Sequence, residues 1–424
     1  MVPAPPWVRP APFDGSPGSL AEHARAVGRM MDGLARLWLG PTEPPTDLPR
    51  GFEDTALVVP TSGSTGSARS VALTRAALRS SQQLTARRLD GHGAWLPLLP
   101  PTHIAGIQVL ARSHHAAREL DADAPLLPRP LPDLRRSFTA RTFADAARGV
   151  LDAADAAEVP AYASLVPTQL LRLMEPEETE ACALARDLLG RFAGVLVGGA
   201  GTDPGVLQRA RDLGAKVITT YGASETAGGC VYDGEPLPGV DLALQDAEAG
   251  TGRLLIESPT LATGYLTADG RGDRDLFTAG PDGRAFLTSD LARLDGGRLQ
   301  ILGRADDVIV SGGRKILPQR IERAISGDEA LAAVIADCVV VGVPDREWGE
   351  RLVCLIVART PAGADSDPDP QATLPELVVG RLRTGNLAPH EVPRRVLVVP
   401  ALPRLGIGKI DRAAARSLAE HAQA

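Results

Sequence analysis

The spacing of apolar residues along the first two-thirds of the chain predicts alternating strands and helices. Short apolar runs at residues 56–60, 94–99 and 193–197 are typical of buried strands. Apolar residues at helical spacing predict a helix over residues 19–39, and Thr74 is a suitable N-cap for a second helix that extends to about Leu89. This pattern indicates an α/β protein.

One βαβ unit is predicted in particular detail. After the strand at 193–197, Asp203 can cap a helix that has Pro204 at its first position and Gly214 at its end. The next strand follows at residues 216–220. Because ligands of parallel sheets bind beyond the carboxyl ends of the strands, the loops that follow these two strands are candidate binding loops.

The last third of the chain has a different pattern. Antiparallel strands are predicted at 252–258 and 284–301, with a hairpin turn at 295–297. Further strands at 308–310, 337–343, 351–358 and 395–399 accompany a helix from Pro318 and a short helix at 374–382, and residues 360–373 are predicted to form an exposed loop. We expect a large N-terminal domain, 1–305, with mixed and parallel sheets, and a small mobile α+β C-terminal domain, 306–424.

Composition narrows the classes of protein. At 424 residues and 44% hydrophobic the chain can bury a large core, and its net charge of -7 does not favour nucleic-acid binding. No apolar run reaches about 18 residues, so no membrane span is expected. The four cysteines lack a CxxC pair, which fits a reducing compartment, and the N-terminus does not resemble a secretory signal. We expect a cytoplasmic protein.

A small polar loop follows the first predicted strand. Its glycines let the backbone approach an anion closely, its hydroxyls and N–H groups can donate to phosphate, and its last residue adds a guanidinium. The spacing is not that of a Walker A loop. In isolation a Ser/Gly-rich surface turn explains the loop as well as a polyphosphate site does. The predicted binding residues are Thr61, Ser62, Gly63, Ser64, Thr65, Gly66 and Arg69.

Two more loops end predicted strands with small or hydroxyl-bearing residues. The first contains Gly198, Gly199 and Ala200, and the second contains Tyr221, Gly222, Ser224 and Glu225. Three such loops at three strand ends predict one shared binding site.

Five motifs in order resemble those of the adenylate-forming superfamily of acyl- and aryl-CoA ligases, adenylation domains and luciferases. The segments at 61–69, 221–225, 288–290, 303–322 and 403–409 are similar to its T-S-G-[ST]-T-G-x-P-K, Y-G-x-T-E, T-G-D, G-R-x-D-D-x-I-x-x-x-G-x-K-I-x-P-x-x-I-E and P-R-T-x-x-G-K patterns. The chain departs from them at Arg69, Ala68, Ser224 and Leu405, which replace Lys, Pro, Thr and Thr.

The resemblance implies that a carboxylate and MgATP give an acyl adenylate, which then reacts with a thiol, usually that of coenzyme A. Lys409 would bridge the carboxylate and the α-phosphate, and Glu225 would hold Mg²⁺, which favours carboxylate and phosphate oxygen. Asp290 would bind the ribose hydroxyls and Arg304 the ribose or phosphate, while residues 198–200 and Tyr221 would line the adenine site. Each charged residue could instead form an ordinary surface contact.

The same resemblance assigns roles to four further residues. Asp306 would be a hinge that lets the C-terminal domain rotate between half-reactions and brings Gly313 toward the thiol. Trp348 would lie near pantetheine, although packing against the small sheet explains it equally well. His103 would gate the acyl pocket, although a lone histidine is more often structural.

The substrate is constrained by what the predicted acyl region lacks. Residues 94–112 contain no Asp or Glu to bind an ammonium group, which argues against an amino acid. Segments 96–106 and 166–170 are most similar to the 2-succinylbenzoate–CoA ligases of menaquinone biosynthesis. The second carboxylate of that substrate needs a cation or donors, for which the candidates are Arg112, Ser164, Thr168 and Gln169.

Three alternatives stay open at this point. They are a ligase for benzoate-like acids, a non-catalytic module that binds an acyl adenylate, and an adenylating domain that delivers its product to a carrier protein. The sequence does not decide whether the chain forms a homodimer.

Overall fold

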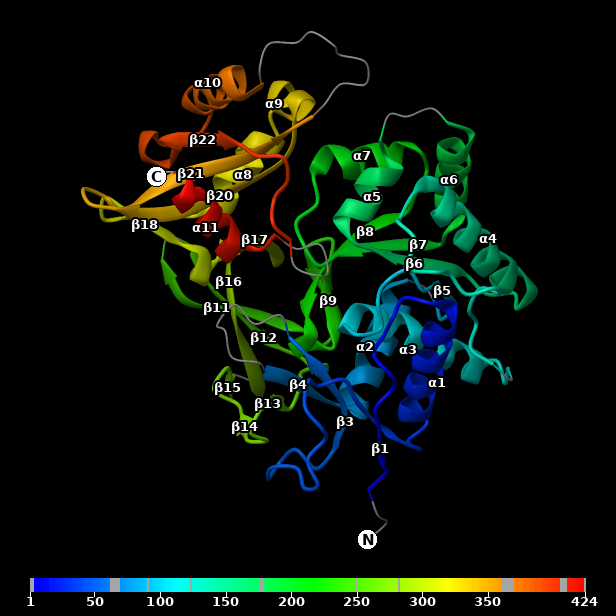
Figure 1. Cartoon of the computed structure of the whole chain (residues 1–424). Helices are drawn as coiled ribbons and strands as arrows, with labels where there is room; N and C mark the ends of the chain where they lie inside the picture. Colours follow the sequence, from blue (N-terminus) through cyan, green and yellow to red (C-terminus); the bar gives the residue numbers. More distant parts are fainter. Residues whose placement is uncertain are drawn as a thin grey trace.

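The computed structural model describes residues 4–61, 69–89, 91–122, 124–175, 179–248, 250–280, 283–359, 370–404 and 410–422. The described residues form four β-sheets with helices packed around them (Figure 1). The predicted α/β class is therefore confirmed. Within these residues no helix is both long enough and apolar enough to cross a membrane.

The first sheet contains the strands on both sides of the predicted phosphate loop. Its order is β1 (Trp7–Val8), β2 (Arg36–Trp38), β3 (Thr55–Pro60), β4 (Arg69–Thr74), β13 (Gly264–Thr267) and β14 (Gly272–Asp273). Strands β3 and β4 are antiparallel, so the loop joins two strands of one hairpin. The sequence did not predict β4. Thr74 does cap α2 (Arg75–Arg88), because its side chain accepts from the N–H of Ala77.

The first helix is shorter than predicted. Helix α1 (Pro17–Met31) ends where Gly33 adopts a φ of +80°, a conformation that glycine tolerates best. Leu34 continues the helical spacing but is 61% exposed. Leu37 belongs to β2, where it pairs with Leu57 in a parallel register. The prediction of one helix over 19–39 is therefore wrong beyond residue 31.

The second sheet contains the predicted βαβ unit. Strands β5 (Ala94–Leu96), β6 (Ala161–Leu165), β7 (Gly194–Gly198) and β8 (Val217–Ala223) are parallel, and β9 (Gly228–Tyr232) and β10 (Glu235–Pro236) are antiparallel additions. Helix α7 (Pro204–Asp212) connects β7 to β8, and the Asp203 side chain accepts from the N–H of Val206. The other helices here are α3 (Ile104–Glu119), α4 (Ala140–Ala156), α5 (Pro167–Leu173) and α6 (Glu180–Arg191).

The third sheet is antiparallel, as predicted. It contains β11 (Asp241–Glu248), β12 (Thr251–Glu257), β16 (Arg284–Asp295), β15 (Phe277–Ala279) and β17 (Arg298–Arg304). Gly296 and Gly297 form the hairpin turn between β16 and β17 with φ of +54° and +82°.

The fourth sheet contains only strands that follow residue 308. They are β18 (Ile309–Ser311), β19 (Arg314–Ile316), β20 (Ile335–Asp345), β21 (Gly349–Ala358) and β22 (Arg395–Val398), with helices α8 (Pro318–Ser326), α9 (Glu329–Val334), α10 (Pro370–Thr384) and α11 (Arg412–His421). These elements lie together at one end of the molecule (Figure 1). Helix α10 begins before the predicted residue 374, which corrects the end of the loop predicted at 360–373. The domain boundary at Asp306 stays a prediction.

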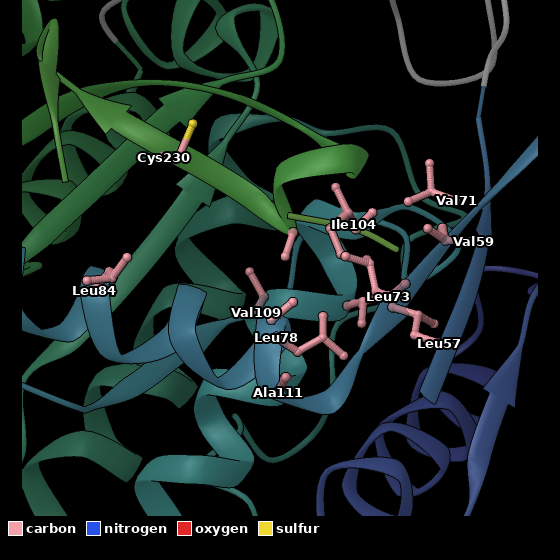
Figure 2. Packing of buried hydrophobic residues seen from close by; sticks show 14 of the residues in the cluster. Leu57, Val59, Val71, Leu73, Leu78, Leu84, Ile104, Val109, Ala111 and Cys230 are labelled. Atoms are coloured by element: carbon pink, nitrogen blue, oxygen red, sulfur yellow. The ribbon is translucent and has the colours of Figure 1, made fainter. Parts of the chain in front are cut away.

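One buried cluster packs the first two sheets together. It joins Leu57 of β3 and Leu73 of β4 to Leu78 of α2, Val109 of α3 and Cys230 of β9 (Figure 2). All five side chains are fully buried. Burial of this size stabilises each large side chain by about 1.5–3 kcal/mol. The core therefore fixes the strands that flank residues 62–68 relative to the end of β8.

Candidate active site

Glu225 lies in a short 3-10 turn, η1 (Ser224–Thr226), directly after β8. The turn ends at Ala227, whose left-handed φ of +50° is uncommon for a residue with a side chain. The Ala227 carbonyl accepts hydrogen bonds from Gln108 Nε2 at 2.7 Å and Ser81 Oγ at 3.0 Å. Both side chains are buried and come from α3 and α2. The turn that carries Glu225 is thus held from two helices.

A second set of contacts connects Glu225 to Arg69, the last residue of the predicted phosphate loop. The hydroxyl of Tyr265 donates to Glu225 Oε1 at 2.8 Å. The guanidinium carbon of Arg69 lies 4.6 Å from the centre of the Tyr265 ring, and Arg69 Nη1 lies 3.4 Å from Asp273 Oδ2. Burial, and next the neighbouring Glu225, raise the pKa of Tyr265 well above its usual value. The hydroxyl therefore stays a donor at neutral pH.

A third set of contacts surrounds Asp290 on β16. The Tyr221 hydroxyl donates to Asp290 Oδ2 at 2.6 Å, and Arg304 Nη1 lies 3.6 Å from Oδ1. Arg304 also donates to Asp306 at 3.1 Å. Burial, and next the Asp290 carboxylate, raise the pKa of Tyr221 well above its usual value. The predicted ribose-binding, adenine-binding and hinge residues are thus in contact with one another.

The ends of β7 and β8 each carry a glycine, Gly198 and Gly222, that has no room for a side chain. A Cβ at Gly198 would lie 2.2 Å from Thr220 Oγ1, and a Cβ at Gly222 would lie 2.1 Å from the Gly228 carbonyl. Gly199 has a φ of +88° with open space around its Cβ position. These positions keep the backbone beside Tyr221 free of side chains, which suits close approach of a flat ligand.

Part of the predicted site lies outside the described residues. Thr61 and Arg69 are described, and the Thr61 hydroxyl donates to the Arg69 carbonyl. Residues 62–68 and Lys409 are not among the described residues. The roles predicted for them stay predictions, as do those of the described site residues.

The residues predicted to meet coenzyme A lie in the part formed by the fourth sheet. The Trp348 ring lies 4.1 Å from the guanidinium carbon of Arg394, and a Cβ at Gly312 would lie 2.8 Å from the same ring. Gly313 has a φ of +74° and is exposed, with nothing near its Cβ position.

His103, the predicted acyl-pocket residue, lies directly before α3, and its Nδ1 is 3.0 Å from the Thr102 hydroxyl.

The donor set suits Mg²⁺ bound together with phosphate. No group of three or more His, Cys, Asp or Glu side chains that could hold a metal occurs in the described part of the chain. Glu225 is half-buried, and Tyr265 engages one of its two oxygens. Mg²⁺ usually binds one or two carboxylates, several waters and substrate phosphates. The residues present therefore fit a cation that arrives with a nucleotide.

The surroundings of Arg112 do not support its suggested contact with the substrate carboxylate. Arg112 is only 5% exposed, its guanidinium carbon lies 4.7 Å from the Trp95 ring, and it donates to Thr85 at 3.1 Å. It lies nine residues along the chain from His103, which is about two and a half helical turns or roughly 13.5 Å. The guanidinium is thus enclosed by other side chains, although its Nε has no hydrogen-bond partner among the described residues.

Sequence reasoning missed Tyr265, Gln108 and Ser81. Their positions depend on contacts between elements far apart in the chain, and no spacing rule indicates them. A shallow, open surface depression lined by Gln83, Ala86, Arg87, Gly91 and His92 lies at the end of α2 and includes none of the predicted site residues.

The chain is similar to known proteins in both sequence and fold. The family model for the AMP-binding enzyme matches residues 142–266, and the model for the AMP-binding enzyme C-terminal domain matches residues 328–409. The structure of o-succinylbenzoate CoA synthetase (MenE) from Bacillus subtilis in complex with the acyl-adenylate intermediate OSB-AMP is similar, with a TM-score of 0.63, 21% identity and coverage of 93% of this chain and 80% of that chain. ATP-bound MatB from Rhodopseudomonas palustris has a TM-score of 0.68 at 23% identity over 88% of this chain and 70% of that chain.

The solved structures show a shared fold, and the two family models match domains of AMP-binding enzymes. The probable 2-succinylbenzoate–CoA ligase of Mycobacterium tuberculosis is 38% identical over 85% of this chain and 84% of that protein. The 2-succinylbenzoate–CoA ligase of Lactococcus lactis is 25% identical over 87% of this chain and 72% of that protein. The chain belongs to the 2-succinylbenzoate–CoA ligase family of AMP-binding enzymes.

Proposed function

We propose that this protein is an ATP-dependent ligase that converts 2-succinylbenzoate to 2-succinylbenzoyl-CoA, a step of menaquinone biosynthesis. A carboxylate oxygen of the acid attacks the α-phosphorus of ATP, and pyrophosphate leaves. The thiolate of coenzyme A then attacks the acyl carbon, and AMP leaves. The thiol proton passes to solvent.

The observation that carries this proposal is the pair of polar groups at the carboxyl end of β8, one around Asp290 and one around Glu225. Asp290, held by Tyr221 and next to Arg304, can accept from ribose hydroxyls. Glu225 and Arg69, both in contact with Tyr265, provide a carboxylate for a cation and a guanidinium for phosphate oxygens. One nucleotide can use both groups, because Tyr221 and Glu225 are four residues apart.

The remaining roles complete the proposal. Lys409 supplies the positive charge that brings the acid and the α-phosphate together, since two anions otherwise repel. Bound Mg²⁺ would neutralise phosphate charge beside Glu225. Rotation about Asp306 would exchange Lys409 for Gly313 and Trp348 as coenzyme A enters, and His103 would border the acyl group. The four free cysteines fit a cytoplasmic enzyme.

The first experiment measures pyrophosphate release with MgATP and 2-succinylbenzoate, with and without coenzyme A. Benzoate and medium-chain fatty acids serve as comparison acids. Among these acids, we expect only 2-succinylbenzoate to give rapid pyrophosphate release. Coenzyme A should increase the rate of this release. Preference for benzoate would overturn the substrate but keep the mechanism. Release without stimulation by coenzyme A would favour a carrier protein as acceptor, and no release with any acid would favour a binding module.

Substitution of the predicted catalytic lysine tests the first half-reaction. Lys409→Ala should lower the rate of pyrophosphate release at least ~100-fold, because the transition state loses its positive charge. ATP binding should persist, since other residues hold the nucleotide. Lys216→Ala, at an exposed position before β8, is the matched control and should retain full activity. Full release by the Lys409 variant would remove that lysine from the mechanism.

A further inference from the structure

Tyr265 lies between two opposite charges at the nucleotide end of the candidate site. It is on β13, which pairs antiparallel with β4, so Tyr265 is opposite Val71 and two residues from the level of Arg69. The side chain is 3% exposed. One end of it, the hydroxyl, donates to Glu225 at 2.8 Å, and its ring face lies 4.6 Å from the Arg69 guanidinium carbon.

Each contact holds its partner without neutralising it. The hydroxyl engages one carboxylate oxygen of Glu225 and carries no charge. The ring attracts the guanidinium through its quadrupole, a weaker contact than a carboxylate offers. Arg69 is further oriented by Asp273, 3.4 Å away, yet its side chain keeps 25% of its surface exposed. Glu225 keeps one carboxylate oxygen outside the contact with Tyr265, and Arg69 keeps part of its side chain exposed although Asp273 pairs with its Nη1, so both residues can still contact a ligand.

Without the ring between them, Arg69, which already pairs with Asp273 through Nη1, could also pair directly with Glu225. A bidentate guanidinium–carboxylate pair is the contact these two groups favour most. Such a pair would occupy the Glu225 oxygens that a cation needs and the Arg69 donors that phosphate needs. The ring thus separates Arg69 from Glu225, and the hydroxyl orients the Glu225 carboxylate.

We propose that Tyr265 is a positioning residue that keeps Arg69 and Glu225 apart and oriented so that one binds phosphate and the other Mg²⁺. This inference rests on the proposed function, since it assumes that MgATP is the ligand of the site. Tyr265 itself touches neither reacting group.

The test separates the two roles of the side chain by substitution. Tyr265→Phe keeps the ring and removes the donor, so the Mg²⁺ concentration for half-maximal ATP binding should rise about fivefold. At saturating Mg²⁺ the ATP affinity should change less than about twofold. Tyr265→Leu removes the ring as well, and ATP affinity at saturating Mg²⁺ should also fall about tenfold. Calorimetric titration of ATP at a series of MgCl₂ concentrations measures both quantities.

A control variant separates positioning from packing. The Phe277 ring centre lies 5.7 Å from that of Tyr265, in the same buried cluster. Phe277→Leu should lower the melting temperature but leave the Mg²⁺ dependence of ATP binding unchanged. In the Tyr265→Leu background, Arg69→Gln should restore part of the Mg²⁺ affinity, because it removes the competing partner of Glu225.

The outcomes are distinct for this inference and for the proposed function. Unchanged Mg²⁺ dependence in Tyr265→Phe, or the same shift in Phe277→Leu, would overturn the positioning role and leave the ligase proposal intact. The titration needs neither acid nor coenzyme A. A wild-type chain that binds MgATP but converts no acid would overturn the ligase proposal, while the shift in Tyr265→Phe would still support the inference.

Discussion

At the scale of single residues, the contact between Tyr221 and Asp290 is, at 2.6 Å, the shortest polar contact among the described residues of the candidate site. The Asp290 side chain is 20% exposed, so the lost donor in Tyr221→Phe is only partly replaced by water. We expect the free energy of unfolding to fall by about 1–3 kcal/mol. The KM for ATP should rise about tenfold because Asp290 is no longer aimed. Urea unfolding and steady-state kinetics measure the two effects.

A second buried tyrosine provides the control for this substitution. Tyr162 is fully buried and donates to the Leu89 carbonyl at 2.8 Å. Tyr162→Phe should lower stability by a similar amount and leave the KM for ATP unchanged, since the Leu89 carbonyl that accepts from it follows α2 and is not a predicted site residue. If both variants affect the KM equally, the Tyr221 contact only supports the fold.

At the scale of elements, the turn between β18 and β19 offers two adjacent glycines with different surroundings. Gly312 and Gly313 have φ of +56° and +74°, so alanine at either costs about 1 kcal/mol of backbone strain. Alanine at 312 would also place its Cβ 2.8 Å from the Trp348 ring, whereas 313 has open space. Gly312→Ala should therefore lose a further ~1–3 kcal/mol of stability and displace Trp348.

Unfolding in urea and the fluorescence of Trp348, taken as the difference from Trp348→Phe, measure these effects. With Trp348 proposed to face coenzyme A, Gly312→Ala should raise the KM for coenzyme A more than the KM for ATP. If Gly312→Ala and Gly313→Ala affect stability and Trp348 fluorescence equally, the Trp348 ring moves away from the new Cβ at 312 at no cost in stability, which would contradict the prediction.

Elements were predicted from the sequence where the signal is local. Asp203 and Gly214 bound α7 by capping rules that operate within one or two turns, and both ends are confirmed. Strand β4 was missed because the segment 69–74 is short and lies between a Ser/Gly-rich segment and a helix. Only its pairing with β3 and β13 makes it a strand. Tyr265 was missed for the same reason. Its role arises from a partner strand nearly two hundred residues away.

At the scale of the whole molecule, the buried cysteines and tyrosines set an alkaline limit to stability. Burial raises the pKa of Cys230 to about 12 and raises those of Cys338 and Cys354 well above the usual range. Burial is also the main cause of the raised pKa values of Tyr221 and Tyr265. All five groups must stay neutral in the folded chain, and they occupy three of its sheets.

The sign of the pH effect follows from where the protons are held. Above the ordinary thiol pKa of 9.0 the unfolded chain loses the proton of Cys230, while the folded chain keeps it up to about pH 12. Unfolding then releases a proton, so the free energy of unfolding falls as pH rises through this window, by up to about 1.4 kcal/mol per pH unit for each such group. Denaturant unfolding from pH 7 to 11 should show this decline.

Cys230→Ala isolates one group from the others. At pH 7 the variant should be less stable than the wild type, because Cys230 is fully buried on β9 and its sulfur fills the core. Above pH 9, unfolding of the wild type releases the Cys230 proton, whereas unfolding of the variant does not. The free energy of unfolding therefore falls faster with pH in the wild type, and the difference between the two proteins should shrink steadily. A difference that stays constant from pH 7 to 11 would show that the folded chain lets this thiol ionise as freely as the unfolded chain does.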